Sequence, residues 1–162
     1  MEGPTKSDPA CEIVVYRVFD APRELVWQAM TDPKHVIHWW GPNGFTTTVE
    51  QMDVHVGGIW KFVMHGPDGV NYPNKSVFLE VVKPERVVYR HGGGREHGPG
   101  ASFIGTWTFE AEGAGQTKVT IRLAFASPEE REFVIKEFSA LEGGKQTLGR
   151  LGEYLPKMPP LH

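Results

Sequence analysis

The stretch Thr117-Lys-Val-Thr-Ile-Arg-Leu-Ala-Phe-Ala-Ser-Pro-Glu-Glu130 decides the fold, because its pattern changes from strand to helix. In its first part the apolar side chains alternate with polar ones, and they are Val119, Ile121, Leu123 and Phe125. A period of two predicts a strand with one buried face. Ser127, Pro128 and Glu130 then form the start signal of a helix, with a capping residue, a proline in the first turn and a capping-box glutamate. The stretch therefore predicts the last strand of a sheet, followed by a helix.

The predicted C-terminal helix covers residues 128–155 and is the longest in the chain. Its apolar stripe is Val134, Phe138, Leu141, Leu148, Leu151 and Leu155, with Lys145 in the same row. Gly143-Gly144 interrupts this stripe at a cost of about 1 kcal/mol per glycine relative to alanine. We therefore expect a bend, or a close approach to the sheet, at these glycines. Pro156, Pro159 and Pro160 end the helix.

The upstream sequence predicts the rest of an antiparallel sheet. A strand over 12–19 precedes a helix over 22–31 and a second short helix that carries 35–40. Closely spaced strands follow at 45–53, 58–65, 75–82, 86–91, 102–110 and 116–125. Glycine- and proline-rich turns separate these strands, which is typical of hairpins. The sequence thus predicts an α+β domain over 12–155, with a flexible tail at 1–11 and a second tail at 156–162.

The composition excludes several classes of protein. The 162 residues carry a formal net charge of −3, with 40% hydrophobic and 23% charged residues, which indicates one globular domain. No basic run offers a footprint for nucleic acid or an anionic membrane, and no apolar run is long enough to span one. Cys11 is the single cysteine, so a disulfide within the chain and a cysteine-rich zinc site are excluded. With no signal-peptide pattern after Met1, a cytoplasmic location is expected.

Both faces of the predicted sheet carry apolar side chains. The face with the large rings holds Trp60, Phe62 and Met64 on one strand and Phe103, Trp107 and Phe109 on another. The opposite face would hold Ile59, Val63, Phe78, Val82 and Ile104. An exposed apolar patch often marks a partner surface, so the second face predicts a homodimer or another partner contact.

Several motifs resemble one protein family. They are Val18–Trp27 (VFDAPRELVW), Trp39–Phe45 (WWGPNGF), Met52–Trp60 (MDVHVGGIW), Gly66–Gly69 (GPDG), Pro84–Tyr89 (PERVVY) and Glu142–Leu155 (EGGKQTLGRLGEYL). In order and spacing they resemble the helix-grip superfamily, also called SRPBCC or START-like and birch-pollen-allergen-like. Within it they are similar to the branch named after the activator of the heat-shock protein 90 ATPase. The resemblance covers about residues 12–155.

The resemblance implies a helix-grip fold, in which a curved antiparallel sheet of about seven strands wraps around a long C-terminal helix. It also implies a cavity between the two that takes apolar ligands. Some relatives are cyclases or aromatases, and the founding member of the branch stimulates a chaperone, which links the family to the stress response. Three hypotheses follow: non-catalytic binding of an apolar small molecule, a module that stimulates a chaperone ATPase, and a cyclase- or aromatase-like enzyme.

The expected cavity residues combine the aromatic face with the helix stripe. The apolar ones are Trp40, Trp60, Phe62, Met64, Tyr72, Tyr89, Trp107, Phe138, Leu141 and Leu148. The polar ones are His65, Glu80 and His91. Tyrosine and tryptophan can orient a ligand through their polar ends while their rings pack against it. No cofactor is expected.

No pattern for catalysis or metal binding stands out. A serine elbow is absent, and no nucleophile has a base at a recognisable spacing. His35 and His38 have a spacing that could hold a metal, but we interpret them as exposed helical histidines and expect no metal site. The run His91–Gly100 lacks the Lys-Ser/Thr and the following helix of a phosphate loop. We expect it to be a long hairpin loop, either a rim of the cavity or a solvated tip.

Overall fold

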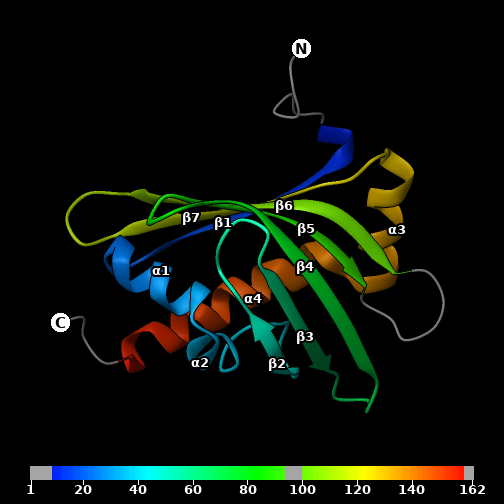
Figure 1. The fold of residues 1–162 in the computed structure, drawn as a ribbon, viewed down its shortest axis with the longest axis horizontal. Helices are drawn as coiled ribbons and strands as arrows, with labels where there is room; N and C mark the ends of the chain where they lie inside the picture. The colour runs from blue at the N-terminus through cyan, green and yellow to red at the C-terminus, as the bar shows by residue number, and fades with distance from the viewer. Residues whose placement is uncertain (1–8, 94–99, 159–162) are drawn as a thin grey trace.

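A computed structural model describes residues 9–93 and 100–158, and shows an antiparallel sheet bent around a C-terminal helix (Figure 1). The strands are β1 (Glu12–Phe19), β2 (Thr46–Met52), β3 (Ile59–His65), β4 (Asn71–Val82), β5 (Arg86–Gly93), β6 (Ala101–Ala111) and β7 (Thr117–Ala124). The helices are α1 (Arg23–Thr31), α2 (Pro33–Val36), α3 (Pro128–Phe138) and α4 (Ala140–Tyr154), with 3-10 turns at Pro9–Cys11 and Leu155–Lys157.

The seven strands form one sheet in the order β1-β7-β6-β5-β4-β3-β2. All neighbouring strands are antiparallel. β1 is an edge strand and pairs with β7, from Glu12 opposite Ala124 to Phe19 opposite Thr117. The helix α4 lies along the concave side of the sheet, with α1 and α2 near its C-terminal end (Figure 1). The α+β helix-grip fold, the two short helices after the first strand and the C-terminal helix are therefore confirmed.

The last helix is not continuous, which differs from the prediction of one helix over 128–155. The helix is interrupted between α3 and α4 by a break at Ser139, whose φ of 51° is left-handed. Of the two alternatives expected at Gly143-Gly144, a bend or a close approach to the sheet, the structure shows the close approach. A Cβ on Gly144 would lie 3.3 Å from the Val15 side chain, so glycine lets α4 lie directly on β1.

Two hydrophobic clusters result from this break. The main core lies between the sheet, α1 and α4, and its largest fully buried side chains include Trp39, Trp60 and Trp107. A second, smaller cluster of Ile13, Phe125 and Val134 lies under α3. The break at Ser139 separates the helix that covers the main core from the helix that covers the small cluster.

The outward face of the sheet is less apolar than predicted. Phe78 is only 1% exposed and belongs to the main core, so its expected outward orientation was wrong. A bulge between Phe78 and Glu80 shifts the register with β5, and an extra residue reverses which face the following side chains occupy. Val82 therefore does face outward, at 37% exposure.

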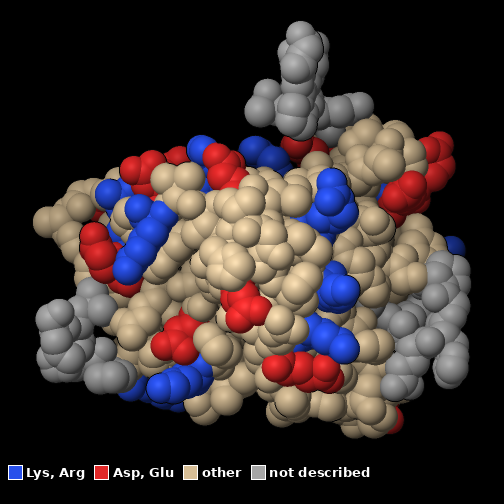
Figure 2. Space-filling model, viewed as in Figure 1, with Lys and Arg blue, Asp and Glu red and all other residues tan. Residues whose placement is uncertain are grey.

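The surface carries charges of both signs. On the face shown in Figure 2, lysine and arginine side chains alternate with aspartate and glutamate, and apolar or neutral residues separate them. Among residues 9–93 and 100–158, no helix is long and apolar enough to cross a membrane.

Candidate functional site

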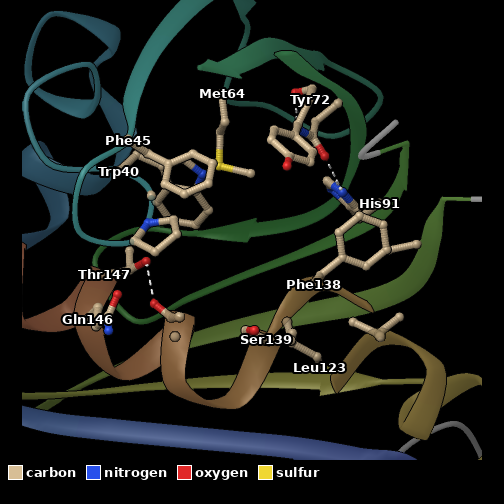
Figure 3. A pocket seen from close by; sticks show the side chains of 18 of the residues that line it. Trp40, Phe45, Met64, Tyr72, His91, Leu123, Phe138, Ser139, Gln146 and Thr147 are labelled. Atoms are coloured by element: carbon tan, nitrogen blue, oxygen red, sulfur yellow. Dashed lines mark hydrogen bonds between the residues drawn. The ribbon is translucent and has the colours of Figure 1, made fainter. Parts of the chain in front are cut away.

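A cavity of about 600 Å³ lies between the concave face of the sheet, the α3–α4 junction and the loop that follows α2 (Figure 3). This volume is in the usual range for small-molecule sites, about 300–1,000 Å³. Strands β3, β4, β5, β6 and β7 supply one wall, and α3 and α4 supply the other. The cavity therefore occupies the place where the helix does not fill the curve of the sheet.

Most of the expected cavity residues do line this space. They are Trp40, Trp60, Phe62, Met64, Tyr72, Tyr89, Phe138 and His91. Met64 points its sulfur toward the centre, opposite the rings of Phe138 and His91 (Figure 3). The wall is thus largely aromatic, and flat apolar groups pack well against such surfaces.

Other expected residues lie elsewhere. Trp107 and Leu148 are 0% and 1% exposed and pack in the main core, behind the residues that form the wall. Leu141 is 37% exposed, because the break at Ser139 turns the start of α4. These three side chains are not among the residues that line the cavity.

Two polar residues expected in the cavity also lie outside it. The His65 ring lies beside the Thr48 hydroxyl at 2.9 Å and the Asn71 side chain at 2.8 Å, near the strand edge. Glu80 accepts two hydrogen bonds from Arg86, at 2.7 and 3.0 Å. The Arg86 guanidinium also holds the pKa of the Glu80 carboxyl below its usual value. Both side chains therefore belong to surface pairs.

Some residues that the sequence did not predict as cavity residues close the cavity at one end. Pro42 and Phe45, in the loop after α2, are part of the lining. Arg150 on α4 holds this loop by donating to the carbonyls of Gly41 and Pro42, at 2.9 and 3.0 Å. The Asn43 amide also donates to the Gln146 side chain at 3.1 Å. The WWGPNGF motif was the available signal, but only tertiary contacts show that it folds over a cavity.

The floor of the cavity is a stack of rings centred on Trp60. Its ring lies 4.5 Å from Phe62 and 5.0 Å from Trp40, measured between centroids. The Trp40 contact is edge-to-face, with an interplanar angle of 68°. The Trp60 indole N–H has no hydrogen-bond partner within the described residues. The ring therefore contributes packing and shape to the floor, beneath the half-buried Trp40.

Tyr89 lies flat across β6 because the residue beneath it is glycine. A Cβ on Gly105 would lie 2.3 Å from the Tyr89 ring. The Tyr89 hydroxyl accepts a hydrogen bond from the Trp107 indole N–H at 3.3 Å. Burial raises the pKa of the Tyr89 phenol, so the group is neutral at physiological pH.

His91 is locked in a buried chain of hydrogen bonds. The Asn74 side-chain NH₂ donates to the Tyr72 carbonyl at 2.7 Å, so the Asn74 oxygen faces His91 and accepts from its Nε2–H at 3.0 Å. The His91 Nδ1 then accepts from the Ser76 hydroxyl at 2.9 Å. The ring also stacks on Phe103, with centroids 4.6 Å apart. Both nitrogens are therefore engaged, and one tautomer is fixed.

The burial of His91 predicts a pH dependence of stability. Desolvation lowers its pKa to about 4 in the folded protein, against about 6.5 in an unfolded chain. Between these values the unfolded state binds more protons, so stability falls as pH falls through this window, by up to about 3 kcal/mol. Urea unfolding at pH 7 and pH 4.5 measures the loss. We expect a smaller loss in His91→Gln, which cannot titrate, and an equal loss in the variant would contradict this assignment.

His35 and His38 both contact the ring of Tyr154. The His35 Nδ1 lies 2.7 Å from the Tyr154 hydroxyl, and His38 stacks on the same ring at 5.5 Å. Among residues 9–93 and 100–158, no group of three or more metal-ligating side chains is found. The centre of the glycine-rich run, residues 94–99, lies outside the described residues, so its expected role as a rim stays a prediction.

The bent sheet, the helix along its concave side and the cavity between them define a helix-grip domain. This chain belongs to the family described as Activator of Hsp90 ATPase homolog 1-like protein, whose model matches residues 20–156. No curated protein matches the chain in sequence.

Solved structures with the same fold come from several bacteria. A protein from Arthrobacter aurescens is 26% identical, with a TM-score of 0.83 over 94% of this chain and 91% of its own. A protein from Mycobacterium smegmatis is 25% identical, with a TM-score of 0.82 over 94% of this chain and 96% of its own. A Nitrosomonas europaea protein at 24% identity has a TM-score of 0.79 over 94% and 99%. Each match covers almost the whole domain.

Proposed function

We propose that this protein binds an apolar small molecule in the cavity between the sheet and α4, and that it does not transform this molecule. The observation that carries the proposal is the cavity of about 600 Å³ with its aromatic wall. Burying an apolar ligand against this wall removes apolar surface from water, at about 25 cal/mol per Å². A cytoplasmic location is part of the proposal.

The chemistry of the wall supports binding without catalysis. His91 is the one histidine among the described lining residues, and both of its nitrogens are already hydrogen-bonded. Ser76 is 0% exposed, so its hydroxyl does not reach a ligand. A general base must lie within hydrogen-bond reach of the proton that it removes. A cyclase- or aromatase-like reaction is the alternative that these contacts favour less.

The family description gives a second alternative, a module that stimulates a chaperone ATPase. It rests on family membership rather than on the geometry of a site. A coupled ATPase assay with the chaperone of the same organism tests this alternative. Analytical sedimentation at high protein concentration would test the predicted homodimer contact.

Filling the cavity provides a direct test. A displacement screen with the neutral dye N-phenyl-1-naphthylamine, against fatty acids, flavonoids and polyketides, should identify binders. Ala140 on α4 is half-buried and lines the cavity, so we expect Ala140→Phe to weaken dye binding at least about tenfold, a loss of about 1.4 kcal/mol.

The matched control for this variant is Lys145→Phe, which adds the same ring at an exposed position of α4 outside the lining. It should bind the dye as the wild type does. Thermal unfolding of both variants shows that they are folded. Equal dye binding by Ala140→Phe and the wild type would place the ligand outside the cavity and contradict the proposal.

A further inference from the structure

Two polar side chains of β4 lie side by side on the cavity wall. Tyr72 and Asn74 are two residues apart, so they face the same side of the strand, about 7 Å from each other. We propose that they form a polar anchor that donates hydrogen bonds to a carbonyl oxygen of the ligand, which we infer to be a neutral, flat aromatic ketone. This inference rests on the proposed function.

The first donor of the anchor is the Tyr72 hydroxyl. Its ring is half-buried and packs against Phe45, with centroids 5.7 Å apart. Figure 3 shows the hydroxyl pointing into the cavity, in the space between Met64 and His91. Within the described residues this oxygen has no hydrogen-bond partner. The ring that carries it is held in place by its contact with Phe45. An oriented hydroxyl with an open position is what a ligand oxygen requires.

The second donor is the Asn74 side-chain NH₂. Asn74 is 5% exposed and lines the cavity. One of its two N–H groups donates to the Tyr72 carbonyl, while its oxygen accepts from His91. The other N–H has no partner within the described residues. A buried donor without a partner is unfavourable, so a ligand acceptor in this position gains more than it would at a solvated site.

The neighbouring groups decide which ligand atom the anchor prefers. His91 offers no acceptor, because its Nδ1 already accepts from Ser76. The anchor therefore presents donors, and a carbonyl oxygen satisfies them. Among the described lining residues the charged ones are Glu137 and Glu142, and none is lysine or arginine. An uncharged acceptor suits this wall better than a carboxylate does.

The shape of the wall indicates that the part of the ligand beyond the carbonyl group is flat and aromatic. Trp40 after α2, Phe103 on β6 and Phe138 on α3 are half-buried rings that line the space. Flat aromatic groups pack against such rings in stacked or edge-to-face contacts. The carbonyl end then lies at β4 and the aromatic body lies between the sheet and α4.

Fluorene and 9-fluorenone provide a matched pair of probes, because they differ in the carbonyl group. Their Kd values are measured by quenching of tryptophan fluorescence, for the wild type and for Tyr72→Phe. We expect the ratio of the fluorene Kd to the fluorenone Kd to fall about fivefold in Tyr72→Phe, which is typical for the loss of one hydrogen bond. The control is Tyr16→Phe, at a 65% exposed tyrosine outside the cavity, and it should leave the ratio unchanged.

The infrared carbonyl band of bound fluorenone gives a second measurement. A hydrogen bond lowers its frequency, so the band should lie lower in the wild type than in Tyr72→Phe. An unchanged Kd ratio together with an unchanged band would overturn the anchor while the proposed function stands. If neither probe binds the wild type while the naphthylamine dye does, the anchor fails and the proposed function stands. If the dye does not bind either, the proposed function fails as well.

Discussion

Replacing Trp60 with alanine should lower the free energy of unfolding by about 3–5 kcal/mol, the usual range for a buried aromatic side chain. Trp60 is 0% exposed and is in ring contact with Trp40, Phe62 and Trp107. The close-packed rings around it cannot collapse into the space that the substitution leaves. A domain of this size is typically stable by about 5–15 kcal/mol, so the loss is a large part of the total.

Urea unfolding followed by far-ultraviolet circular dichroism measures this loss, since tryptophan fluorescence would change with the substitution itself. Val56→Ala serves as the control, because Val56 is 67% exposed and its truncation removes little buried surface. A loss below about 1 kcal/mol in Trp60→Ala would show that the rings repack. The floor of the cavity would then be softer than the structure indicates.

The second large effect is expected from Gly105→Ala, a substitution that adds one methyl group. The new Cβ would lie 2.3 Å from the Tyr89 ring and 2.6 Å from its hydroxyl oxygen, and an aromatic ring cannot bend away. Overpacking of this kind costs about 1–3 kcal/mol. It should also displace Tyr89 from Trp107 and alter the cavity wall, so probe binding should weaken as well.

Gly92→Ala is the matched control for this substitution. Gly92 lies on the adjacent strand β5, and an added Cβ there meets nothing within 4 Å. Its unfolding free energy should change by less than about 0.5 kcal/mol. If Gly105→Ala and Gly92→Ala behave alike in unfolding and in dye binding, the close packing of Tyr89 on β6 is contradicted.

The fold was predictable because strand and helix periods are local properties. The alternation in 117–125 and the cap at Ser127 depend on neighbouring residues, and both are present in the structure. The register bulge after Phe78 was not predictable, because it depends on pairing with β5. The break at Ser139 was missed for a similar reason. Glycine favours a left-handed backbone, so the pair at 143–144 was the stronger signal.

The sequence predicted which face of the sheet carries the site, but not which side chains on that face border the cavity. Alternation correctly placed Trp60, Phe62 and Trp107 on the concave side of the sheet. Which of these rings borders the cavity depends on how far α4 lies from each strand, and no local pattern encodes this distance. The same limit applies to Asn74 and Phe45, which became lining residues only through contacts with β5 and α4.

The division of the interior by Ser139 has a consequence for how this scaffold can diversify. Val134 and Phe138 contribute to the wall from the small cluster, while Trp60 and Tyr89 contribute from the main core. Mutations on α3 can therefore reshape one side of the binding space while the tryptophan-rich half keeps the domain folded. Selection can adjust ligand preference and thermodynamic robustness as nearly independent traits, because separate groups of side chains determine them.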